Sequence, residues 1–541
     1  MDAKLLRQLA DELFTKKLPL TSLHQEIAEN FYPERADFTV LRSLGNDFAA
    51  NLTTSYPVMC RRDLGNQLGT MLRPTAKPWF RTAIRYSQKS DNETKVYLEW
   101  FRETQRRAMY DKTSLFTRAT KEGDHDFAAF GQCAISVEMN SQADGLLYRC
   151  WHLRDMVWQE NQDGKIGFIA RKWKPTALNL FRLFGNKLDD KIVKLKDKQP
   201  FAEVEVMHLV VEADMYDEKT QRNQPYWSIW YDCHNEKVIE ATPTWTAIYV
   251  IPRWQTVSNS QYSFSPAAVC ALPDARLIQA MTYTLLEAGE KATNPPMIAT
   301  QDAVRTDVAL YAGGITWVDN EYDEKLGEAL RPIAQDFRGF GYGMEMAANA
   351  QAMLQKAFFL DKLAMPQRGP EMTAYEVAQR VQSYIREAMP IFEPMEMEYN
   401  AALCDTTFEI MWRNGAFGDP RAWPKKLRGA EIEFTFESPL HDAVEQQKGH
   451  LFQEAQGLIS VAVSLDPTCS ALPKAEVALR DALSGIGVPA TWMNSEADVE
   501  AAKNAMAEQQ QQQQALAAME QGSNVVKNIA TAGGVTPTQA M

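Results

Sequence analysis

The chain has 541 residues, of which 45% are hydrophobic and 23% are charged. These are ordinary values for a folded protein, and the length exceeds what one hydrophobic core supports, so we expect several packing units. The formal net charge of -13 argues against general nucleic-acid binding, because such proteins gather Lys and Arg to displace counterions. Any DNA contact would involve a few Lys or Arg side chains on an otherwise acidic protein.

Signals for membranes and for oxidised compartments are missing from the sequence. Apolar runs such as 458–465 are too short to span a bilayer, and the first residues mix both charge signs without the apolar centre of a signal peptide. The seven cysteines are an odd number without CxxC spacing. We therefore expect a protein made and kept in a cytoplasm, with its cysteines reduced and in the core.

In the first half of the chain the spacing of apolar residues changes once. Up to about residue 125, apolar residues recur at spacings of three and four, which predicts helices. From Phe127 to Trp254 the period is two, with turn residues such as 161–164, which predicts an antiparallel β-rich region. The expected helices are 4–18, 20–33, 59–72 and 96–116, and the expected strands are 132–140, 146–153, 165–173, 202–213, 226–232, 237–241 and 246–254.

A long helix returns at 274–293, with Leu277, Met281 and Leu285 on one face. Pro295 and Pro296 cannot continue it. A short region with a Gly313-Gly314 turn and β-like residues around it follows. A second helix is expected from about Met344 to Leu360.

A third helix begins with a capping box, Thr373 to Glu376, and reaches to about Asn414 with a bend near Pro390 and Pro394. A β segment at 431–440 precedes a C-terminal helical block. Beyond about Glu496 the sequence is rich in Ala and Gln, including Gln509 to Gln514. We expect this tail to be helical in part and frayed at its end.

Signatures of catalysis are scarce. The sequence contains no GxxxxGK[ST], HExxH or GxSxG. Gly339, Gly341 and Gly343 superficially suggest a glycine-rich loop, but no βαβ strand precedes them, and a flexible entry to a helix is the better interpretation. The sequence predicts no cofactor, no metal and no catalytic residue.

Two small groups of residues contain side chains that can bind a metal. His125 lies between Asp124 and Asp126, and Cys233 adjoins His234. For the first we favour capping or solvation at a helix-to-strand junction, and for the second a hairpin turn. The acidic runs 319–325 and 393–399 could hold a cation, but solvated or subunit-facing surface explains them better.

The chain has thirteen tryptophans, many of them in the β-rich region. They could line a ligand groove, but core and interface packing is the more common role of such side chains. A chain of this length with few catalytic motifs and much aromatic and helical surface indicates a component of an assembly.

Four segments, 66–84, 126–140, 249–299 and 372–415, resemble in order and spacing the portal, or head-to-tail connector, proteins of short-tailed bacteriophages. The resemblance extends over most of the chain. Phe264 precedes Ser265-Pro266 where the family often has glycine, and the poly-Gln tail looks peculiar to this sequence. These departures leave the local turn and the role of the tail open.

The resemblance implies an α+β portal fold with a mainly helical wing, a β-rich wing portion, a two-helix stem, a small α/β clip, a long helix through the wing and a helical crown. The boundaries it implies are a wing at 1–272 (β-rich at 127–254), stem helices at 273–293 and 334–361, a clip at 294–333, a tunnel loop at 362–372, the long wing helix and β segment at 373–440, a crown at 441–500 and an Ala/Gln-rich tail at 501–541.

The resemblance also implies a function. Proteins of this family form a ring, usually a dodecamer, at one capsid vertex, around a channel through which double-stranded DNA is packaged and later ejected. They are not enzymes and work in the virion, not in a membrane. The partners implied are sibling subunits, double-stranded DNA, the major capsid protein, the terminase packaging motor and tail adaptor proteins.

Within the stem, small side chains would let neighbouring subunits approach closely, although packing within one subunit is the alternative. In the tunnel loop and the adjacent stem, cations are predicted to touch DNA phosphates transiently, because tight contacts would prevent sliding; solvated loop charges are the alternative. The interface candidates are Ala280, Ala288, Ala292, Ala347, Ala350 and Ala357, and the channel candidates are Lys356, Lys362, Gln367 and Arg368.

Two other classes of protein remain open from the sequence. A metal-dependent hydrolase with a scattered site of Asp, Glu and His would be a monomer or small oligomer with an acidic pocket. Another structural virion component, such as a tail or scaffold protein, would usually lack the order of helix, clip, helix, loop and long helix.

Overall fold

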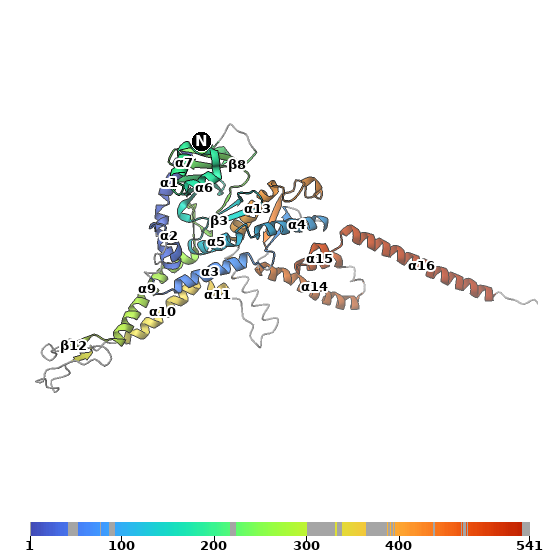
Figure 1. Cartoon of the computed structure of the whole chain (residues 1–541). Helices are drawn as coiled ribbons and strands as arrows, with labels where there is room; N and C mark the ends of the chain where they lie inside the picture. Colours follow the sequence, from blue (N-terminus) through green and yellow to red (C-terminus); the bar gives the residue numbers. More distant parts are fainter. Residues whose placement is uncertain are drawn as a thin grey trace, which may run out of the picture. The chain divides into compact units, whose positions relative to one another are not determined.

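A computed structural model shows a chain of mixed helices and sheets that divides into two compact units (Figure 1). The first unit comprises residues 1–79 and 107–414, and the second comprises 80–106 and 415–541. The predicted α+β class is confirmed. The structure describes residues 2–41, 52–75, 77–85, 92–216, 223–299, 330–332, 338–363, 387, 390, 393, 395–436, 439–466, 468, 472 and 474–532.

A five-stranded antiparallel sheet is the largest β element of the first unit. Short turns join its outer pairs, as predicted for 161–164 and for Cys233-His234. At the first of these turns the Asn161 side chain accepts hydrogen bonds from the backbone N–H groups of Asp163 and Lys165, at 2.9 and 3.0 Å. The strands are β4 (Met156–Glu160), which the sequence analysis did not predict, β5 (Ile166–Trp173), β6 (Val206–Glu212), β7 (Tyr226–Asp232) and β8 (Lys237–Thr244).

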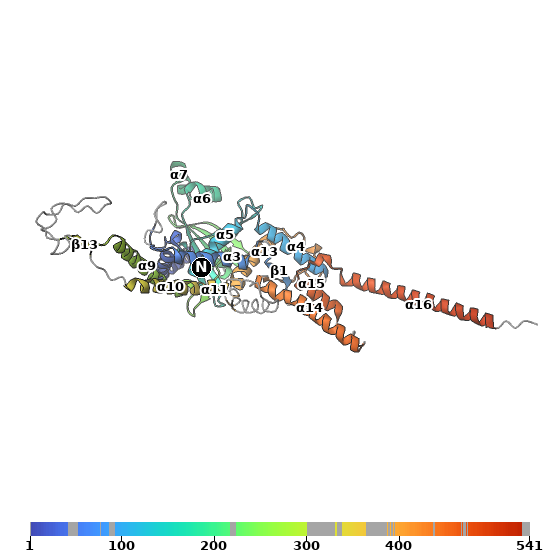
Figure 2. The ribbon, with the colours of Figure 1, turned by 90° about the horizontal axis from the view of Figure 1, so that it is seen from below.

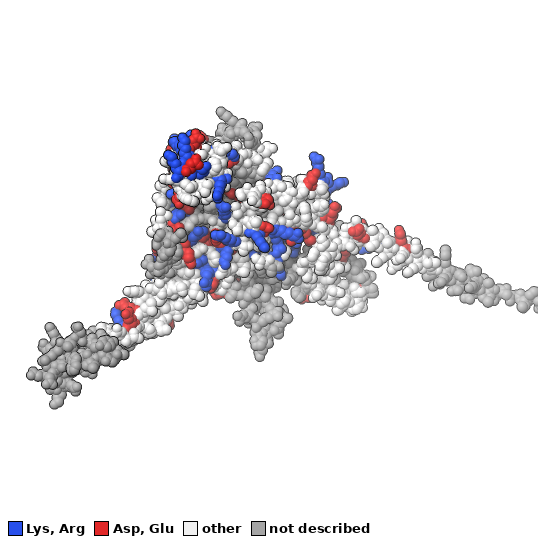
Figure 3. All heavy atoms as spheres, in the orientation of Figure 1, with Lys and Arg blue, Asp and Glu red and all other residues white. Residues whose placement is uncertain are grey.

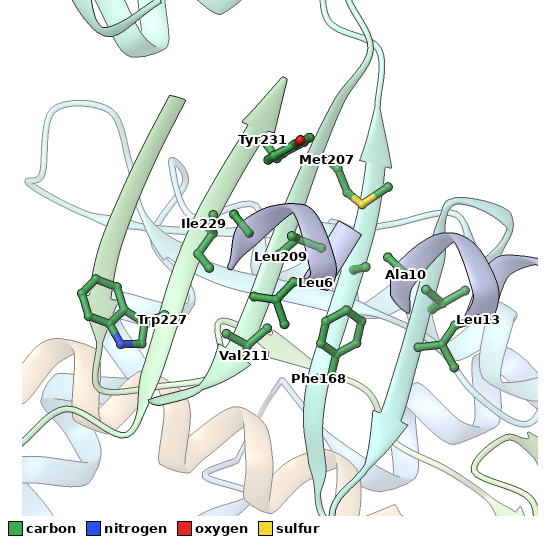
Figure 4. Packing of buried hydrophobic residues seen from close by; sticks show 13 residues of the cluster. Leu6, Ala10, Leu13, Phe168, Met207, Leu209, Val211, Trp227, Ile229 and Tyr231 are labelled. Atoms are coloured by element: carbon green, nitrogen blue, oxygen red, sulfur yellow. The ribbon is translucent and has the colours of Figure 1, made fainter. Parts of the chain in front are cut away.

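One face of this sheet is covered by the N-terminal helix α1 (Ala3–Lys16), as Figure 4 shows. Leu6, Ala10 and Leu13 recur at helical spacing and are buried against side chains such as Phe168 and Leu209. Alternation along the strands brings these residues to a single face. The predicted first helix and the predicted strands therefore share one hydrophobic core.

Two short helices that the sequence analysis missed, α6 (Ala177–Phe184) and α7 (Asp190–Lys198), connect β5 to β6. Each begins at a side-chain cap: Thr176 accepts from the N–H of Asn179, and Asp189 accepts from the N–H of Lys191. Their apolar sides form a small cluster of their own with the sheet. Helices of two turns carry too few periodic positions to stand out inside a β-rich region.

A second, three-stranded sheet has the order β3-β2-β9. Ile135 in its central strand pairs with Cys150 on one side and Val250 on the other. The helix before it ends at Phe130, three residues beyond the predicted change of period. These elements are α5 (Phe116–Phe130), β2 (Ile135–Met139), β3 (Leu146–Cys150) and β9 (Tyr249–Val250), and three shorter ones complete the region: α8 (Ala213–Tyr216), β10 (Gln255–Thr256) and β11 (Ser263–Phe264).

Two long helices, α9 (Pro266–Thr293) and α10 (Arg338–Ala357), pack together and extend side by side away from the β-rich part of the first unit (Figures 1 and 2). α9 begins eight residues before the predicted start, because Ser265 caps it and Pro273 is tolerated inside it. Beyond Pro295-Pro296 a short antiparallel pair, β12 (Met297–Ala299) and β13 (Leu330–Pro332), closes the base of the region predicted as the clip. The Gly313-Gly314 turn lies outside the described residues.

After α10 the short helix α11 (Leu360–Leu363) follows. The predicted capping box at Thr373 and Glu376 lies outside the described residues. The C-terminal part of that predicted third helix is present as a π-helical turn (Glu396–Ala401) followed by α13 (Ala402–Arg413). The first unit also contains α2 (Leu18–Phe31) and α3 (Tyr56–Leu72).

The second unit combines a segment from the first quarter of the chain with its C-terminus. The unpredicted strand β1 (Phe80–Ile84) pairs with the predicted strand β14 (Ile432–Phe436), and Phe101 of α4 lies against Phe417 and Trp423. Residues 80–106, which the resemblance assigns to the wing, thus pack with the C-terminal part. The helices are α4 (Asn92–Met109), α14 (Pro439–Leu465), α15 (Ala475–Gly485) and α16 (Glu496–Ala532), the last of which contains the poly-Gln run.

Two further features of the described residues concern membrane-spanning helices and the cysteines. Among the described residues no helix is both long and apolar enough to cross a membrane. The expectation that all cysteines lie in the core is wrong for Cys270, which is exposed in α9, because that position faces away from the packed side of the helix. Cys60, Cys133 and Cys404 are buried.

The interpretation of Asp124, His125 and Asp126 as a helix-to-strand junction is wrong. All three lie inside α5, and both carboxylates are buried, so they could not remain there without cationic partners. No cluster of three or more metal-binding side chains occurs in the part of the chain that the structure describes. Each of the three side chains instead faces an arginine: Asp124 pairs with Arg73, His125 with Arg61 and Asp126 with Arg35.

The pair of Arg73 and Asp124 joins three elements. The Arg73 guanidinium also donates to Asn400 at 2.8 Å and lies over the Tyr399 ring at 4.5 Å, while the Asn400 amide donates to the carbonyl of Leu72 at 3.2 Å. Burial alone would lower the pKa of Arg73, but the Asp124 carboxylate raises it above its ordinary value. The charged pair therefore fixes α3, α5 and the π-helical turn to one another.

We expect Arg73→Met to lower the free energy of unfolding by about 3–5 kcal/mol, because it leaves a buried carboxylate without its partner. The matched control is Arg62→Met in α3, the helix that ends just before Arg73. Among the described residues the ion-pair partner of Arg62 is Asp63, at 3.9 Å on the exposed surface, and this contact should be worth less than about 1 kcal/mol. Urea denaturation of the purified variants measures both, and equal midpoints would contradict the role of the buried pair.

Candidate functional site: the α9–α10 hairpin

The start of α9 is fixed to the end of α5. The Ser265 hydroxyl donates to the carbonyl of Ala128 at 2.7 Å and accepts from the N–H of Ala268 at 3.1 Å. Gly131 ends α5 with a φ of 72°, and a Cβ at this position would lie 2.1 Å from the carbonyl carbon of Phe264. A φ of this sign favours glycine, and only glycine leaves room for this close approach. The contacts of Ser265 and Gly131 thus set the direction in which α9 begins.

At its midpoint α9 is held by the segment that leads into α3. The Gln279 side-chain oxygen accepts from the Thr53 N–H at 2.8 Å, and its amide donates to the Thr54 carbonyl at 3.0 Å. The Thr53 hydroxyl donates to the Gln279 backbone carbonyl at 2.8 Å. On the neighbouring turn the Arg276 guanidinium pairs with Glu26 of α2. Beyond this point α9 contacts α10 instead of the body of the unit.

Close packing between α9 and α10 depends on a glycine. A Cβ at Gly343 would lie 2.9 Å from Cδ2 of Leu285. Gly339, Gly341 and Gly343 lie inside α10, so their interpretation as a flexible entry to a helix is wrong. Further along the same side, Ala350 and Leu354 are buried. A single line of small and apolar side chains on α10 therefore faces α9 and the body of the unit.

Apolar side chains remain exposed on both sides of that buried line. At about 100° per residue, Phe340 and Met344 lie to one side of it, and Tyr342, Met346 and Met353 lie to the other. All five are exposed, Met353 by 54%. The surface that remains, opposite the buried line, carries small or polar residues such as Ala348 and Ala352.

α9 shows a similar arrangement. Relative to Leu285, which packs against Gly343, Leu277 lies to one side and Leu286 to the other. Tyr283 lies nearly opposite Leu285, and all three of these side chains are exposed. Figure 3 shows that the visible surface of the two helices is almost free of Lys, Arg, Asp and Glu except at the far end of α9. Exposed apolar side chains at this density are typical of a surface that another protein covers.

The predicted interface alanines divide into three groups. Ala280 and Ala292 are exposed, whereas Ala288, Ala347 and Ala357 are half-buried. Ala350 is 4% exposed because it lies on the buried line. Packing within the subunit thus uses part of this set, and the exposed pair remains available to a neighbour.

The predicted channel residues lie beyond the end of this hairpin. Lys356 is exposed in the last turn of α10, and Lys362 is exposed in α11. Gln367 and Arg368 lie outside the described residues. Just before α11 the chain turns at Phe359, which has a φ of 56°, and the preceding Phe358 is buried against Phe31 of α2 at a ring distance of 5.3 Å. This aromatic contact fixes the point from which the predicted tunnel loop departs.

Sequence reasoning missed the residues that hold the hairpin in place. Gln279 gave no signal, because its partners lie more than 200 positions away in the chain. Gly343 was noticed, but for its flexibility and not for the close approach of Leu285. The exposed apolar positions of α10 could have been found, since they occur at helical spacing on either side of Ala350 and Leu354.

Comparisons with known proteins identify the family of this chain. A family model described as bacteriophage head to tail connecting protein matches residues 3–493. The chain therefore belongs to the bacteriophage head to tail connecting protein family, and the resemblance seen in the sequence is confirmed.

Among its relatives, a probable portal protein of Bordetella phage BPP-1 is 22% identical over 459 residues, which cover 82% of this chain and 80% of that protein. A portal protein of Salmonella phage epsilon15 is 22% identical over 551 residues, which cover 98% and 96% of the two chains. Among solved structures, a chain in the virion of a native gene transfer agent particle is 10% identical and covers 74% of this chain and 89% of its own length, with a TM-score of 0.34.

We expect Gly343→Val to loosen the hairpin, because the added side chain would meet Leu285; overpacking of this kind costs about 1–3 kcal/mol. The control is Gly341→Val in the same helix, where a Cβ would have no neighbour within 4 Å. Hydrogen exchange of the α9 and α10 amides reports the difference. Equal protection in the two variants would show that the close approach at Gly343 is not needed.

Proposed function

We propose that the chain is a portal protein that forms a closed ring, a dodecamer, at one vertex of a phage capsid. The observation that carries this proposal is the set of apolar side chains exposed on both sides of the α9–α10 hairpin. Subunits in a ring meet through two different surfaces, one toward each neighbour. A hairpin with an apolar flank on each side has the surfaces that such contacts require.

In the proposed ring the α9–α10 hairpins surround a channel for double-stranded DNA during packaging and ejection. The net charge of -13 supports sliding over tight binding, since an acidic body repels phosphates. Lys356, Lys362, Gln367 and Arg368 then supply a few transient contacts where α10 ends and the predicted tunnel loop begins. The protein acts as a conduit and attachment point, not as an enzyme.

The proposal also assigns the other parts of the chain. Residues 1–272 form the wing, 294–333 the clip, 441–500 the crown and 501–541 the tail of each subunit. The partners would be the major capsid protein, the terminase packaging motor and the tail adaptor proteins, and the site of action would be the virion after assembly in the host cytoplasm. The family membership supports these assignments.

We expect Met353→Glu to prevent ring assembly, because it would bury a charge in the contact between neighbouring hairpins. The matched control is Ala352→Glu, which places the same charge one residue earlier on the surface opposite the buried line. Size-exclusion chromatography with light scattering measures the assembly state. Rings formed equally well by both variants would contradict the proposed interface.

We expect the double change Lys362→Ala and Arg368→Ala to leave the ring intact but to alter packaging or retention of DNA, because it removes two phosphate contacts per subunit. The control keeps both charges, as Lys362→Arg with Arg368→Lys. The measurement is the DNA content of purified particles before and after incubation at raised salt. Normal packaging and retention by the alanine variant would count against the channel role.

A further inference from the structure

The lobe formed by α6 and α7 is more basic than the rest of this acidic chain. Figure 3 shows Lys and Arg side chains gathered there, over α7, with fewer acidic ones between them. Part of this charge is used within the lobe. Lys196 lies over the Phe181 ring at 4.1 Å and contacts Asp197 at 2.9 Å, and Lys187 pairs with Glu240 at 2.6 Å.

Three other lysines form one face of α7. Lys191, Lys194 and Lys198 follow the spacing i, i+3, i+7, which places them on the same side of the helix. All three are exposed and have no ion-pair partner within the described residues. The opposite side of the helix buries Ile192. Asp189 and Asp190 are acidic neighbours at the start of this face. Asp189 is paired with Lys237 at 2.6 Å, so the three lysines keep a net positive charge.

An exposed aromatic ring stands at the end of this lysine face. Phe201 follows α7 by three residues, and its side chain is 78% exposed. The backbone of the loop that carries it is held by hydrogen bonds on both sides of Phe201. The N–H of Leu178 donates to the Pro200 carbonyl at 3.1 Å, and the N–H of Ala177 donates to the Ala202 carbonyl at 2.8 Å. Holding a phenylalanine in water is unfavourable unless another surface covers it.

We infer that Lys191, Lys194, Lys198 and Phe201, here called the α7 patch, form a docking surface for an acidic surface of another protein. An aromatic anchor beside a cationic rim is typical of protein interfaces, in which the ring is desolvated and the charges select the partner. Double-stranded DNA would use the lysines but would leave the ring unexplained. A second copy of this chain would have to offer an apolar recess within an acidic surface.

This inference rests on the proposed function only in that the partner is sought among the proteins of the phage particle. The partner is defined by its chemistry: a surface rich in Asp and Glu around a recess that accepts one aromatic ring. The lobe is the part of the chain that connects β5 to β6. Substitutions in the α7 patch should therefore not disturb α9 or α10. Docking can therefore be tested separately from ring formation.

The experiment places a photo-crosslinking benzophenone amino acid at Phe201 in particles assembled with this chain. A control carries it at Leu5, which is also exposed but lies on α1. Crosslinked peptides are identified by mass spectrometry after irradiation. We expect position 201, and not position 5, to link to an acidic segment of a different virion protein. Crosslinks only to DNA, only to other copies of this chain, or to nothing in complete particles would each overturn the inference.

A second measurement tests the lysines. The triple change Lys191→Glu, Lys194→Glu and Lys198→Glu should reduce the crosslink from position 201 by about tenfold or more, because it turns attraction into repulsion. The control replaces the same three residues with Arg and should keep the crosslink. An unchanged yield in the Glu variant would contradict the charge requirement.

The mass of the purified assembly separates the two proposals. If the Glu variant forms no rings, its crosslink yield is not used. The docking inference is then judged by the crosslink that position 201 forms in the chain with its lysines intact. If the chain with intact lysines forms no rings but still links through position 201 to an acidic protein, the docking surface survives and the ring proposal fails.

Discussion

The close packing of α9 on α10 is the constraint on which the rest of the account depends. It uses only one line of each helix, at Gly343, Ala350 and Leu354 on α10. Two packed helices alone cannot bury the apolar side chains on their flanks, because a third surface is needed to cover those side chains. The hairpin therefore leaves apolar residues such as Leu286 and Met353 exposed. In the proposed ring, neighbouring hairpins would cover them without any further protein.

The hairpin must also be held at a fixed angle to the body if twelve copies are to close. Ser265 and Gly131 fix the beginning of α9, and Gln279 fixes it at its midpoint. Phe358 fixes the end of α10 against α2. Buried polar groups here have short, directional partners, and such contacts specify an orientation more sharply than apolar packing does. The pair of Arg73 and Asp124 has the same effect deeper in the unit.

Sequence reasoning found the parts of the structure that repeat and missed those that depend on distant partners. The strands β5 to β8 of the large sheet and the helices α1 and α9 were visible from periods of two and three to four residues, whereas β4 was missed. β1 was missed because five residues offer little periodicity, and its partner β14 lies about 350 positions later. Asp124 and Asp126 look like surface residues in a local window. Their burial is understood only once Arg73 and Arg35 are brought beside them.

For the candidate site, the order of helix, short strand pair and helix was predictable, and its contacts were not. Pro295 and Pro296 predict the end of α9. The local sequence around Ala350, however, does not distinguish a residue buried within the subunit from one available to a neighbour. The measurement that tests the central claim most directly is an electron cryomicroscopy reconstruction of the purified assembly. We predict a closed ring in which the flanks of adjacent α9–α10 hairpins touch around a common axis. A solitary chain of 61.2 kDa, or a ring whose hairpins lie far from its axis, would contradict the account.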